Sequence, residues 1–484
     1  MKTYFKLKRK KNSCICGIFI LILLIGIQGN AQQFSSAVKQ FISVNADTLA
    51  LTHAKIIDGT GNTSKSDQTI IIIKGRIAQL GNSASMHVSP SAKIIDCTGK
   101  TIIPGMVMMH EHLFYGESVP PNYLGLEMPL SFPKLYLAGG ATTIRTTGST
   151  EPQTDLNIKR SIDKGQMAGP DIDVTGPYVE RELLPIPEIQ FIKSPEEAEK
   201  EVSYWIDRGC TSFKVYMDIT KDDLKAVVAL AHKNNLKVTG HLCSLTYREA
   251  AELGIDNLEH GFIPCSDFVT DKKENICSFG SVTPSLKKLD VNSEAMKGLM
   301  KFLIDKKVTL TSTLPVFEPA TGREMIPGGG DAALAPQIKQ AVEKGYNLSV
   351  GKDSSDAALF KKEMAWEKQF AEMGGRLMAG VDPTGNGRTI PGYADRHVLE
   401  LLVEAGFTFV QAVKICSLNA AEYLGRDKEI GSIAADKRAD LVLINGDPEK
   451  DIKAVRNTEI VFKNGVGYDS KKLFDSVNGK VGLY

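Results

Sequence analysis

The feature that most constrains the fold is an alternation of short apolar runs and helix-like segments, which continues from about residue 107 to residue 428. Apolar runs lie at 142–147, 171–176, 212–217, 236–242, 256–260, 308–314 and 376–382, and amphipathic segments such as 194–209 and 220–235 separate them. Strand–helix alternation of this kind implies a parallel sheet, because each helix carries the chain back to the start of the next strand. Over about 320 residues, a closed (β/α)8 TIM barrel is the best fit.

The alternative is an open, doubly wound parallel sheet. Such a sheet usually carries a glycine-rich nucleotide loop after its first strand. The chain contains neither GxxxxGK[ST] nor GxGxxG after a predicted strand. The closed barrel is therefore the better prediction, although alternation by itself fits both α/β folds.

Runs of β-branched residues separated by turns occupy the two ends of the chain. One group begins at about residue 46 and includes QTIIIIKGRIAQLG, and the other includes ADLVLINGD and EIVFKNGVGYD near the C-terminus. Runs punctuated by Gly, Asn and Ser are typical of short strands. We therefore predict a small β-sandwich domain built from residues 32–106 and 429–484, with the barrel at 107–428 between them.

The first 31 residues have the composition of a targeting segment. Six basic residues precede an apolar stretch from Cys14 to Ile27, and small residues follow at Gly29 and Ala31. A basic start, a short apolar core and a small-x-small exit are typical of a secretory signal peptide. A membrane anchor needs about 20 apolar residues, which is more than this stretch provides. We therefore predict a signal peptide at 1–31, export to the periplasm or the medium, and no stable membrane insertion after cleavage.

The charge balance changes once this leader is set aside. The whole chain has 58 basic and 57 acidic residues, a formal net charge of +1. Without the six basic residues of the leader, 52 basic residues face 57 acidic ones, and the charge is about −5. Nucleic acids and anionic membranes select basic faces, so we expect a small-molecule substrate and no nucleic acid. The oligomeric state, including a homo-oligomer, stays open.

The cysteines beyond the leader form no CxxC pair. This spacing disfavours a zinc ribbon and a dense disulfide scaffold. One or two disulfides remain compatible with an oxidising compartment.

Histidines are scarce, and four of the eight stand at the ends of predicted barrel strands. His110 and His112, in MHEH, are two residues apart on a strand, so both side chains lie on one face and could chelate one metal. Taken alone, such a pair is more often a polar strand end. His241 ends LKVTGH and His260 ends DNLEH, and each alone is more often a hydrogen-bonded strand end than a ligand.

Two further polar residues fall in strands of the same region. Lys214 lies inside the apolar run SFKVYM, where burial of an unpaired ammonium is costly. A lysine that reaches out to solvent would explain this position. So would a neutral amine that has added carbon dioxide, because the resulting carbamate offers two oxygens to two cations. Asp382 in LMAGVDPTG fits either a metal ligand or a cap of the next helix.

In chain order these residues are His, His, Lys, His, His and Asp, all at the carboxyl ends of predicted strands, where barrel enzymes place their active sites. The set resembles that of the amidohydrolase superfamily, with HxH on strand 1, a carbamylated lysine on strand 4, histidines on strands 5 and 6 and an aspartate on strand 8. Flanking patterns such as IIDGTG, IIPGMV and NLEHG are most similar to the imidazolonepropionase-related and prolidase-like branch. The resemblance extends from about Leu49 to Asp469.

This resemblance implies a metal-dependent hydrolase with a binuclear centre. One ion would be held by His110, His112 and Asp382, the other by His241 and His260, and the carbamate of Lys214 would bridge them. Zn²⁺ suits these ligands, and Mn²⁺, Fe²⁺ or Co²⁺ would also fit. A hydroxide shared by the ions would attack a carbonyl, with Asp382 as general base and then general acid. The implied reaction is hydrolysis of the C–N amide bond of a dipeptide, cyclic amide or N-acyl compound.

Substrate contacts are less constrained by the sequence. Tyr216 is two residues beyond Lys214 on the same strand face, and could hydrogen-bond the substrate or pack at the rim. His397 could meet a substrate carboxylate or lie on a helix surface. Arg145 is expected as a structural ion-pair partner. The stretch 315–336, with three adjacent glycines, is expected as a mobile lid, with disorder as the alternative.

Two other functions compete with this one. A mononuclear deaminase of the same superfamily lacks the bridging lysine, so Lys214 argues against it. A non-catalytic exported binding protein on the same fold is the other alternative. The presence of all six ligand types argues against it.

Overall fold

The computed structural model of the chain describes residues 33–119, 122–181, 186–349, 354–384 and 388–482. The predicted signal peptide at 1–31 lies outside the described residues, so it stays a prediction. No helix in the described ranges is both long and apolar enough to cross a membrane.

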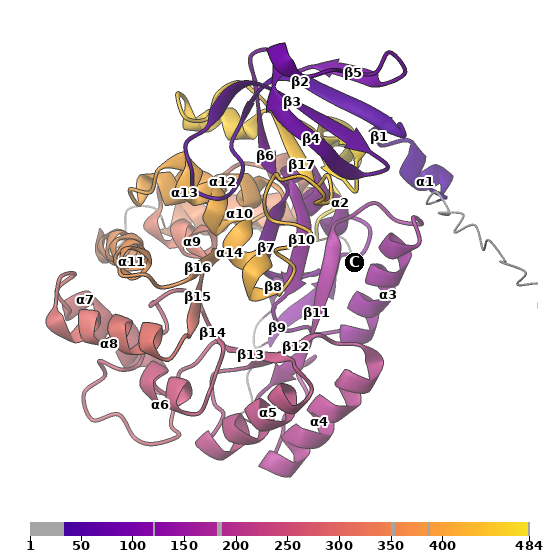
Figure 1. Ribbon diagram of the computed structural model, residues 1–484. Helices are drawn as coiled ribbons and strands as arrows, with labels where there is room; N and C mark the ends of the chain where they lie inside the picture. The colour runs from indigo at the N-terminus through magenta and orange to yellow at the C-terminus, as the bar shows by residue number, and fades with distance from the viewer. Residues whose placement is uncertain (1–32, 120–121, 182–185, 350–353, 385–387, 483–484) are drawn as a thin grey trace, which may run out of the picture. The chain divides into compact units, whose positions relative to one another are not determined.

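A parallel sheet of eight strands lies at the centre of the fold (Figure 1). In chain order its strands are β7 (Met106–Glu111), β10 (Ala141–Thr146), β11 (Asp171–Val179), β12 (Ser212–Val215), β13 (Lys237–Gly240), β14 (Asn257–Glu259), β15 (Thr309–Ser312) and β16 (Leu377–Ala379). The amides of Val381 and Asp382, just past β16, donate to the carbonyl of His110 on β7 at 3.2 and 2.9 Å. These bonds join the last strand to the first and nearly close the barrel. The predicted barrel is confirmed, and the open-sheet alternative is wrong.

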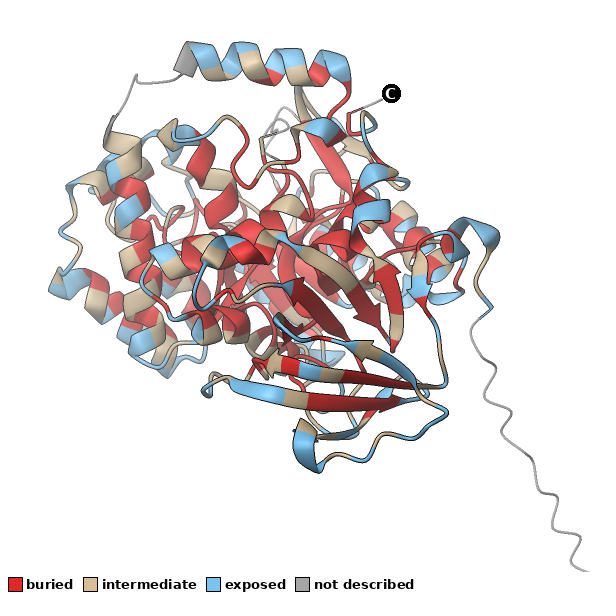
Figure 2. Ribbon diagram, turned by 90° about the horizontal axis from the view of Figure 1, so that it is seen from above, coloured by how far each residue is buried: buried red, intermediate tan, exposed pale blue. Residues whose placement is uncertain are grey.

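The barrel strands are buried on both faces. Every residue of β7, β10 and β12 is buried. Figure 2 shows the strands in red, inside helices whose outer faces are pale blue. One face of each strand packs against helices, and the other faces the side chains that fill the barrel. Strands of this kind have nearly continuous apolar sequences. This burial is why apolar runs predicted the strands correctly.

Helices surround the barrel; all but the last three of them connect its strands, and those three follow β16. The helices are α2 (Phe132–Gly139), α3 (Pro152–Asp163), α4 (Pro195–Arg208), α5 (Lys221–Lys233), α6 (Tyr247–Glu252), α7 (Phe279–Lys288), α8 (Glu294–Asp305), α9 (Leu314–Phe317), α10 (Pro336–Ser349), α11 (Ser354–Glu372), α12 (Tyr393–Glu404), α13 (Phe409–Ile415) and α14 (Leu418–Tyr423). Local signals set their ends. Ser194 caps α4 by accepting a hydrogen bond from the amide of Glu197, and Gly209 follows the last turn with φ of 101°, a conformation that costs glycine little.

The two ends of the chain form a second sheet. Its N-terminal strands are β1 (Ile42–Val44), β2 (Thr48–Ile56), β3 (Lys65–Ile73), β4 (Arg76–Asn82), β5 (Lys93–Asp96) and β6 (Lys100–Pro104), and its C-terminal strands are β17 (Leu441–Asn445), β18 (Thr458–Lys463) and β19 (Val466–Asp469). β17 pairs antiparallel with β6, and β19 with β1. Leu49 and Ile70 share an apolar core with Leu443 and Phe462. The predicted domain built from both chain ends is confirmed, while its exact boundaries stay predictions.

One carboxylate joins this outer sheet to the barrel. Asp171, the first residue of β11, lies 2.7 Å from Arg438 Nη1, 2.9 Å from Lys463 Nζ and 3.1 Å from Arg426 Nη2. Burial opposes a charge on Asp171, but Lys463 and Arg438 outweigh it and hold its pKa well below the usual range. A barrel strand is thereby fixed to three cations of the C-terminal segment.

A hairpin that the sequence did not predict follows β7. β8 (Phe114–Val119) and β9 (Asn122–Glu127) pair antiparallel, with Phe114 opposite Glu127. FYGESV and NYLGLE mix glycine with charged residues, so their alternation is too weak to indicate strands.

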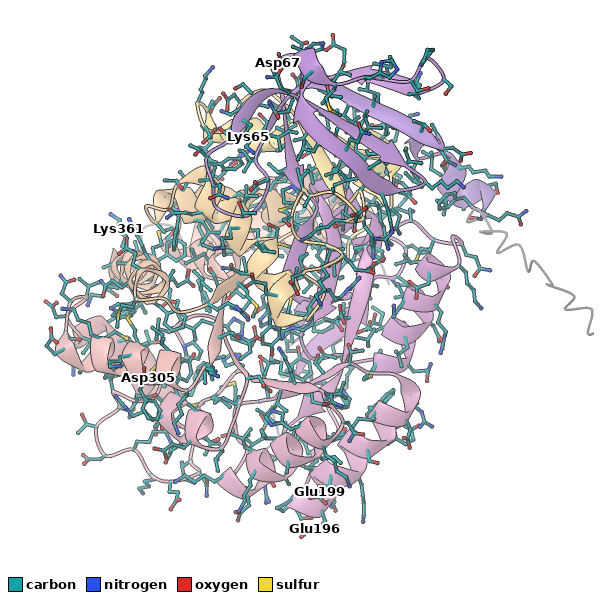
Figure 3. All side chains as sticks on the ribbon, in the orientation of Figure 1. Lys65, Asp67, Glu196, Glu199, Asp305 and Lys361 are labelled. Carbon is teal, nitrogen blue, oxygen red and sulfur yellow. A yellow bond between two sulfur atoms is a disulfide. The ribbon has the colours of Figure 1, made fainter. Side chains whose placement is uncertain are left out.

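Charged side chains lie at the periphery. Figure 3 labels Asp67 at the upper edge and Glu196 at the lower edge of the molecule, and both are exposed. Charges in such positions interact with water and leave the interior to the apolar runs.

Candidate metal centre

The six residues predicted as metal ligands converge at the carboxyl ends of the barrel strands. His110 belongs to β7 and Lys214 to β12, whereas the rest follow the ends of β7, β13, β14 and β16. A cavity of about 300 Å³ is lined by His112, Lys214, His241, His260 and Asp382. Since the carboxyl ends of barrel strands meet at one rim, residues far apart in the sequence share this cavity.

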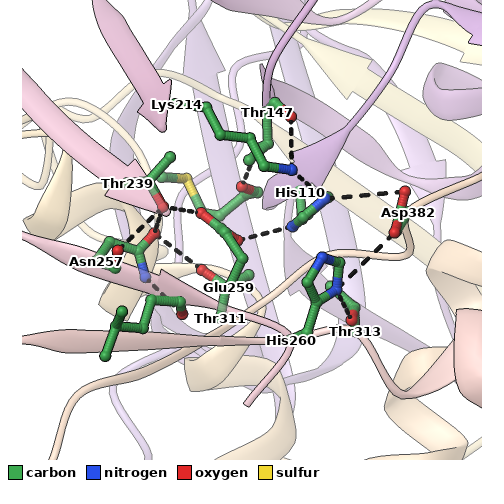
Figure 4. A network of polar contacts seen from close by, with 12 residues as sticks. His110, Thr147, Lys214, Thr239, Asn257, Glu259, His260, Thr311, Thr313 and Asp382 are labelled. Atoms are coloured by element: carbon green, nitrogen blue, oxygen red, sulfur yellow. Dashed lines mark hydrogen bonds and ion pairs between the residues drawn. The ribbon is translucent and has the colours of Figure 1, made fainter. Parts of the chain in front are cut away.

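The predicted metal ligands lie close together. The ring centroid of His260 is 4.5 Å from those of both His110 and His241. Nζ of Lys214 is 3.4 Å from Nε2 of His110. Potential ligand atoms of His110, His260 and Asp382 all lie within 4.8 Å of one another (Figure 4). This spacing suits nitrogen and oxygen donors around one ion or a close pair of ions.

Three of the histidines are oriented by hydrogen bonds at Nδ1. The Nδ1 atoms of His110, His112 and His260 lie 2.7, 3.0 and 2.8 Å from Glu259 Oε2, the Gly148 carbonyl and Thr313 Oγ1, respectively. An imidazole that uses Nδ1 in this way presents the lone pair of Nε2 as a ligand, and such partners fix its orientation in metal sites.

Glu259 anchors a buried polar network behind His110 (Figure 4). Its Oε1 accepts hydrogen bonds from Arg145 Nη2 at 2.7 Å and from the Thr239 hydroxyl. Burial opposes a charge on Glu259, but Arg145 and His110 outweigh it and lower its pKa to about 2. The ionised carboxylate therefore holds the His110 ring in place. The predicted role of Arg145 as an ion-pair partner is confirmed.

The cavity keeps its histidines uncharged. Burial and the Lys214 charge lower the pKa of His110 to about 4 and that of His241 to about 3. Burial lowers the pKa of Lys214 to about 8. Burial also opposes ionisation of Asp382, but His110 and His112 hold its pKa well below the usual range. Neutral imidazoles and an ionised carboxylate are the states in which these groups bind divalent cations. The donor set therefore fits a metal centre.

Two of the six residues have a backbone conformation that is uncommon outside glycine. The φ angle is 68° at His260 and 49° at Asp382. Residues in this left-handed region are strained by the close approach of Cβ, and they cluster at functional sites. The turns after β14 and β16 thus aim both side chains into the cavity at the expense of backbone stability.

A comparison with protein families agrees with this geometry. The sequence profile of the amidohydrolase family matches residues 101–467. The chain belongs to this family. It is a hydrolase that acts on carbon–nitrogen bonds, and the resemblance seen in the sequence is confirmed.

The relatives of this amidohydrolase are distant. It is 22% identical over 417 residues to the imidazolonepropionase of a Geobacillus species, which covers 81% of this chain and 87% of that protein. A shorter match to the imidazolonepropionase of Psychromonas ingrahamii is 32% identical over 112 residues and covers 22% of this chain and only 28% of that protein. The solved structure of a Xaa-Pro dipeptidase with bound methionine in the active site has a TM-score of 0.65 at 18% identity, and covers 87% of this chain and 100% of that one. At this identity the structural likeness concerns the fold alone.

The sequence did not reveal part of the cavity wall of the amidohydrolase. Tyr123 and Tyr178 line the cavity together with the predicted Tyr216. The ring of Tyr216 lies 4.9 Å from Tyr178 and 5.0 Å from His241. Burial raises the pKa of Tyr216, so its phenol stays protonated and able to donate. Continuing the run at 171–176 to the barrel rim would have found Tyr178, whereas the hairpin that carries Tyr123 gave no such signal.

His397, predicted as a contact for a substrate carboxylate, is engaged elsewhere. Its Nε2 lies 2.6 Å from Glu318 Oε2 and its Nδ1 lies 2.8 Å from Glu400 Oε2. Burial opposes a charge on His397, but hydrogen bonds to these two carboxylates raise its pKa to about 9. Both ring nitrogens are therefore occupied, and the substrate contact is not supported. The helix-surface alternative is wrong as well, because His397 is only 6% exposed.

The stretch 315–336, predicted as a lid, folds into short turns. Its 3-10 helices are η2 (Glu318–Thr321) and η3 (Asp331–Ala333), and Ile326 between them is buried. The segment is ordered and packed, so disorder does not describe it, and its motion stays a prediction.

One of the disulfides that the cysteine count left open joins Cys243 to Cys277.

Proposed function

We propose that this amidohydrolase is an exported enzyme that hydrolyses the amide bond of a small molecule with two divalent ions, preferentially Zn²⁺, and a carbamate on Lys214. The observation that carries the proposal is one buried cavity in which neutral imidazoles, an ionised aspartate and a lysine meet. Dipeptides, cyclic amides and N-acyl compounds are the substrate classes. The dipeptidase that shares the fold makes dipeptides the first class to test.

The resemblance to the amidohydrolase superfamily implies the roles that we propose for the chain's own groups. His110, His112 and Asp382 would hold one ion, and His241 and His260 the other. When bound, the ions supply Lewis acidity that activates water and polarises the substrate carbonyl. Asp382 takes the proton from the attacking water and delivers it to the leaving nitrogen as the carbon–nitrogen bond breaks, so a carboxylate and an amine are released. Tyr216 donates a hydrogen bond to the substrate oxygen.

Lys214 must lose its ammonium proton before it can react with carbon dioxide. Because burial lowers its pKa to about 8, part of the population is a neutral amine at neutral pH. Nζ then bonds to the carbon of carbon dioxide and releases one proton, which leaves an anion with two oxygens. Nζ lies 3.4 Å from His110 Nε2, so the carbamate forms beside the metal-facing nitrogens.

Metal analysis tests the binuclear centre without a substrate. We expect about two equivalents of Zn²⁺ per chain in protein prepared with Zn²⁺ and bicarbonate, and a carbamate signal in ¹³C NMR when the bicarbonate is ¹³C-labelled. Lys214→Ala should lose the signal and at least one equivalent of metal. Lys237→Ala, on the next strand but at its opposite end, is the matched control and should keep both. One equivalent in wild type, unchanged by Lys214→Ala, would favour the mononuclear deaminase.

Turnover tests the reaction class. The zinc-loaded chain without residues 1–31 should hydrolyse at least one member of a library of dipeptides, lactams and N-acyl amino acids, with release of an amine. Full metal loading with no turnover across the library would instead support a binding protein on the same fold.

Export is proposed from the leader and is supported by the Cys243–Cys277 disulfide, since disulfides persist in oxidising compartments. Cell fractionation with mass spectrometry of the N-terminus is the direct check. We expect a mature N-terminus at Gln32. Full-length chain in the cytoplasm, with both cysteines reduced, would contradict export.

A further inference from the structure

A second cavity of about 350 Å³, called here the side cavity, adjoins the metal centre. Its walls come from the segments that follow β12, β13, β14 and β15, so it opens at the catalytic rim of the barrel. Cavities of about 300–1,000 Å³ are large enough to take most of a small ligand.

The side cavity is directly connected to the metal-facing residues. His241 lines both the side cavity and the cavity of about 300 Å³ at the metal centre, called here the metal cavity. Phe317, another side-cavity residue, has its ring 5.6 Å from that of His260. A substituent attached to an amide at the metal centre could therefore extend past His241 into the side cavity.

The chemistry of the walls selects an uncharged group. Apolar side chains dominate, among them Met217, Leu242, Val282 and Leu359. Among the described lining residues, the one carboxylate is that of Asp356, and Lys287 Nζ lies 2.7 Å from it. A charged substituent would lose hydration without gaining a new partner there, whereas an apolar one would be released from water.

A disulfide holds the walls together. Cys243, two residues beyond His241, is bonded to Cys277 in the segment that leads into α7. Phe279, the first residue of α7, lines the side cavity and is 71% exposed. Its ring therefore extends the apolar lining of the side cavity toward the surface.

We propose that the side cavity binds a bulky apolar group of the substrate, such as a phenyl ring or a branched aliphatic chain, while the attached amide lies at the metal centre. The inference rests on the proposed function and names its substrate class: amides with a large apolar substituent near the bond that breaks. Charged amino acids and small amides are then poor substrates.

Binding of two hydroxamates tests the proposal without turnover. Both bind Zn²⁺ through the same group, but acetohydroxamate ends in a methyl group and 4-phenylbutyrohydroxamate carries a phenyl ring on a flexible arm. In calorimetry with the zinc-loaded enzyme, we expect the phenyl compound to bind about 10- to 100-fold more tightly.

Variants that fill the side cavity test whether the tighter binding of the phenyl compound arises there. Ala320 is exposed and Thr283 is half-buried, so Ala320→Trp and Thr283→Trp can fill the cavity with little risk to folding. Both should remove most of the phenyl gain and leave acetohydroxamate affinity within about 2-fold. The matched control is Ala332→Trp, which is exposed on the same connection outside the cavity and should keep the gain.

Equal affinity of wild type for the two compounds, no binding of the phenyl compound, or a gain that survives both filled variants would overturn the proposal. A phenyl gain that the filled variants remove, in a protein with no detectable turnover, would support the side cavity and contradict the proposed function. The two ideas can therefore fail separately.

Discussion

Glu259 shows how much of this site depends on a residue that never faces the metal cavity. Its carboxylate is fully buried and binds Arg145 on one oxygen and His110 on the other. The guanidinium keeps the carboxylate ionised, and the carboxylate in turn fixes the Nδ1 proton of His110. The Nε2 lone pair is left available, so an ion-pair residue sets the orientation of a proposed metal ligand.

We predict that removal of the Glu259 charge weakens metal binding. Glu259→Gln should weaken Zn²⁺ binding by about 10- to 100-fold, measured by competition with a chromophoric chelator. Glu252→Gln, exposed at the end of α6, is the control and should bind Zn²⁺ as wild type does. Wild-type affinity in Glu259→Gln, with unchanged thermal stability, would show that His110 needs no anionic partner.

Asp382 is expected to carry the proton, and its amide variant isolates that role. Asp382→Asn keeps the shape of the side chain but cannot accept a proton, so kcat should fall by about 10²- to 10⁴-fold. Metal content should be measured in parallel, to separate proton transfer from ligand loss. The exposed Asp305→Asn serves as the control. A near wild-type kcat in Asp382→Asn would assign the proton to another group.

At this scale, the sequence predicted the residues that converge on the cavity better than those that hold them in place. Histidines and a lysine at the ends of apolar strands are rare enough to be noticed individually. Glu259 was visible only as the neighbour of His260, because its partners lie on other strands. The prediction for His397 failed for a related reason. The sequence around a helical histidine does not show which carboxylates the fold brings to it.

Among the elements, α11 carries a feature with a clear pH dependence. Glu363 and Glu367 are one turn apart on α11, and both are 1% exposed. Burial raises the pKa of both carboxyls, that of Glu367 to about 8 from an ordinary value of 4.5. The proton on Glu367 therefore stabilises the folded state fully below about pH 4.5, and this stabilisation is lost as the pH rises through about 8.

Glu367→Gln should reduce this pH dependence. The amide resembles the protonated acid but cannot ionise, so Tm should fall less between pH 5 and pH 9 than in wild type, as followed by circular dichroism. Glu372→Gln, exposed on the same helix, should keep the wild-type profile. Parallel Tm curves for wild type and Glu367→Gln would mean that Glu367 is already ionised when folded.

A helix or strand could be predicted where its burial or its capping residues leave a clear pattern in the local sequence. Barrel strands are apolar throughout because both faces are covered, and α4 is marked by Ser194 before it and Gly209 after it. The β8–β9 hairpin follows neither rule. Tyr123, on this hairpin, donates to the carbonyl of Thr384 beyond β16, a contact with no local sequence signal.

For the molecule as a whole, the ion pairs of Asp171 connect the barrel to the outer sheet. Asp171→Asn would remove the carboxylate partner of Lys463 and leave Arg438 with Asp440 alone, and we expect it to lower the free energy of unfolding by about 3 kcal/mol. Asp173→Asn is the matched control, since Asp173 has one ion pair, with Arg426 at 3.2 Å, and a 3.4 Å hydrogen bond from the Thr211 hydroxyl, and its loss should cost under about 1 kcal/mol. Urea denaturation measures both. Equal, small losses would mean that apolar packing alone joins the two parts.

The sequence predicted that both chain ends share a domain, because both contain short β-branched runs separated by turns. It did not predict which strands pair. The order of the sheet depends on β17 lying between β6 and β18, and register is set by side-chain packing across strands that no local pattern encodes.

The split origin of this outer sheet has a consequence for biogenesis. β6 pairs with β17, which is synthesised only after the entire barrel. During translation the N-terminal half of the sheet therefore presents an unsatisfied edge, and open edges recruit other strands and aggregate. A ribosome that stalls or terminates before Leu441 would release a polypeptide that contains every predicted metal ligand but is prone to self-association. Yield from a heterologous host should thus depend on complete synthesis of the C-terminal segment, which contributes none of the predicted metal ligands.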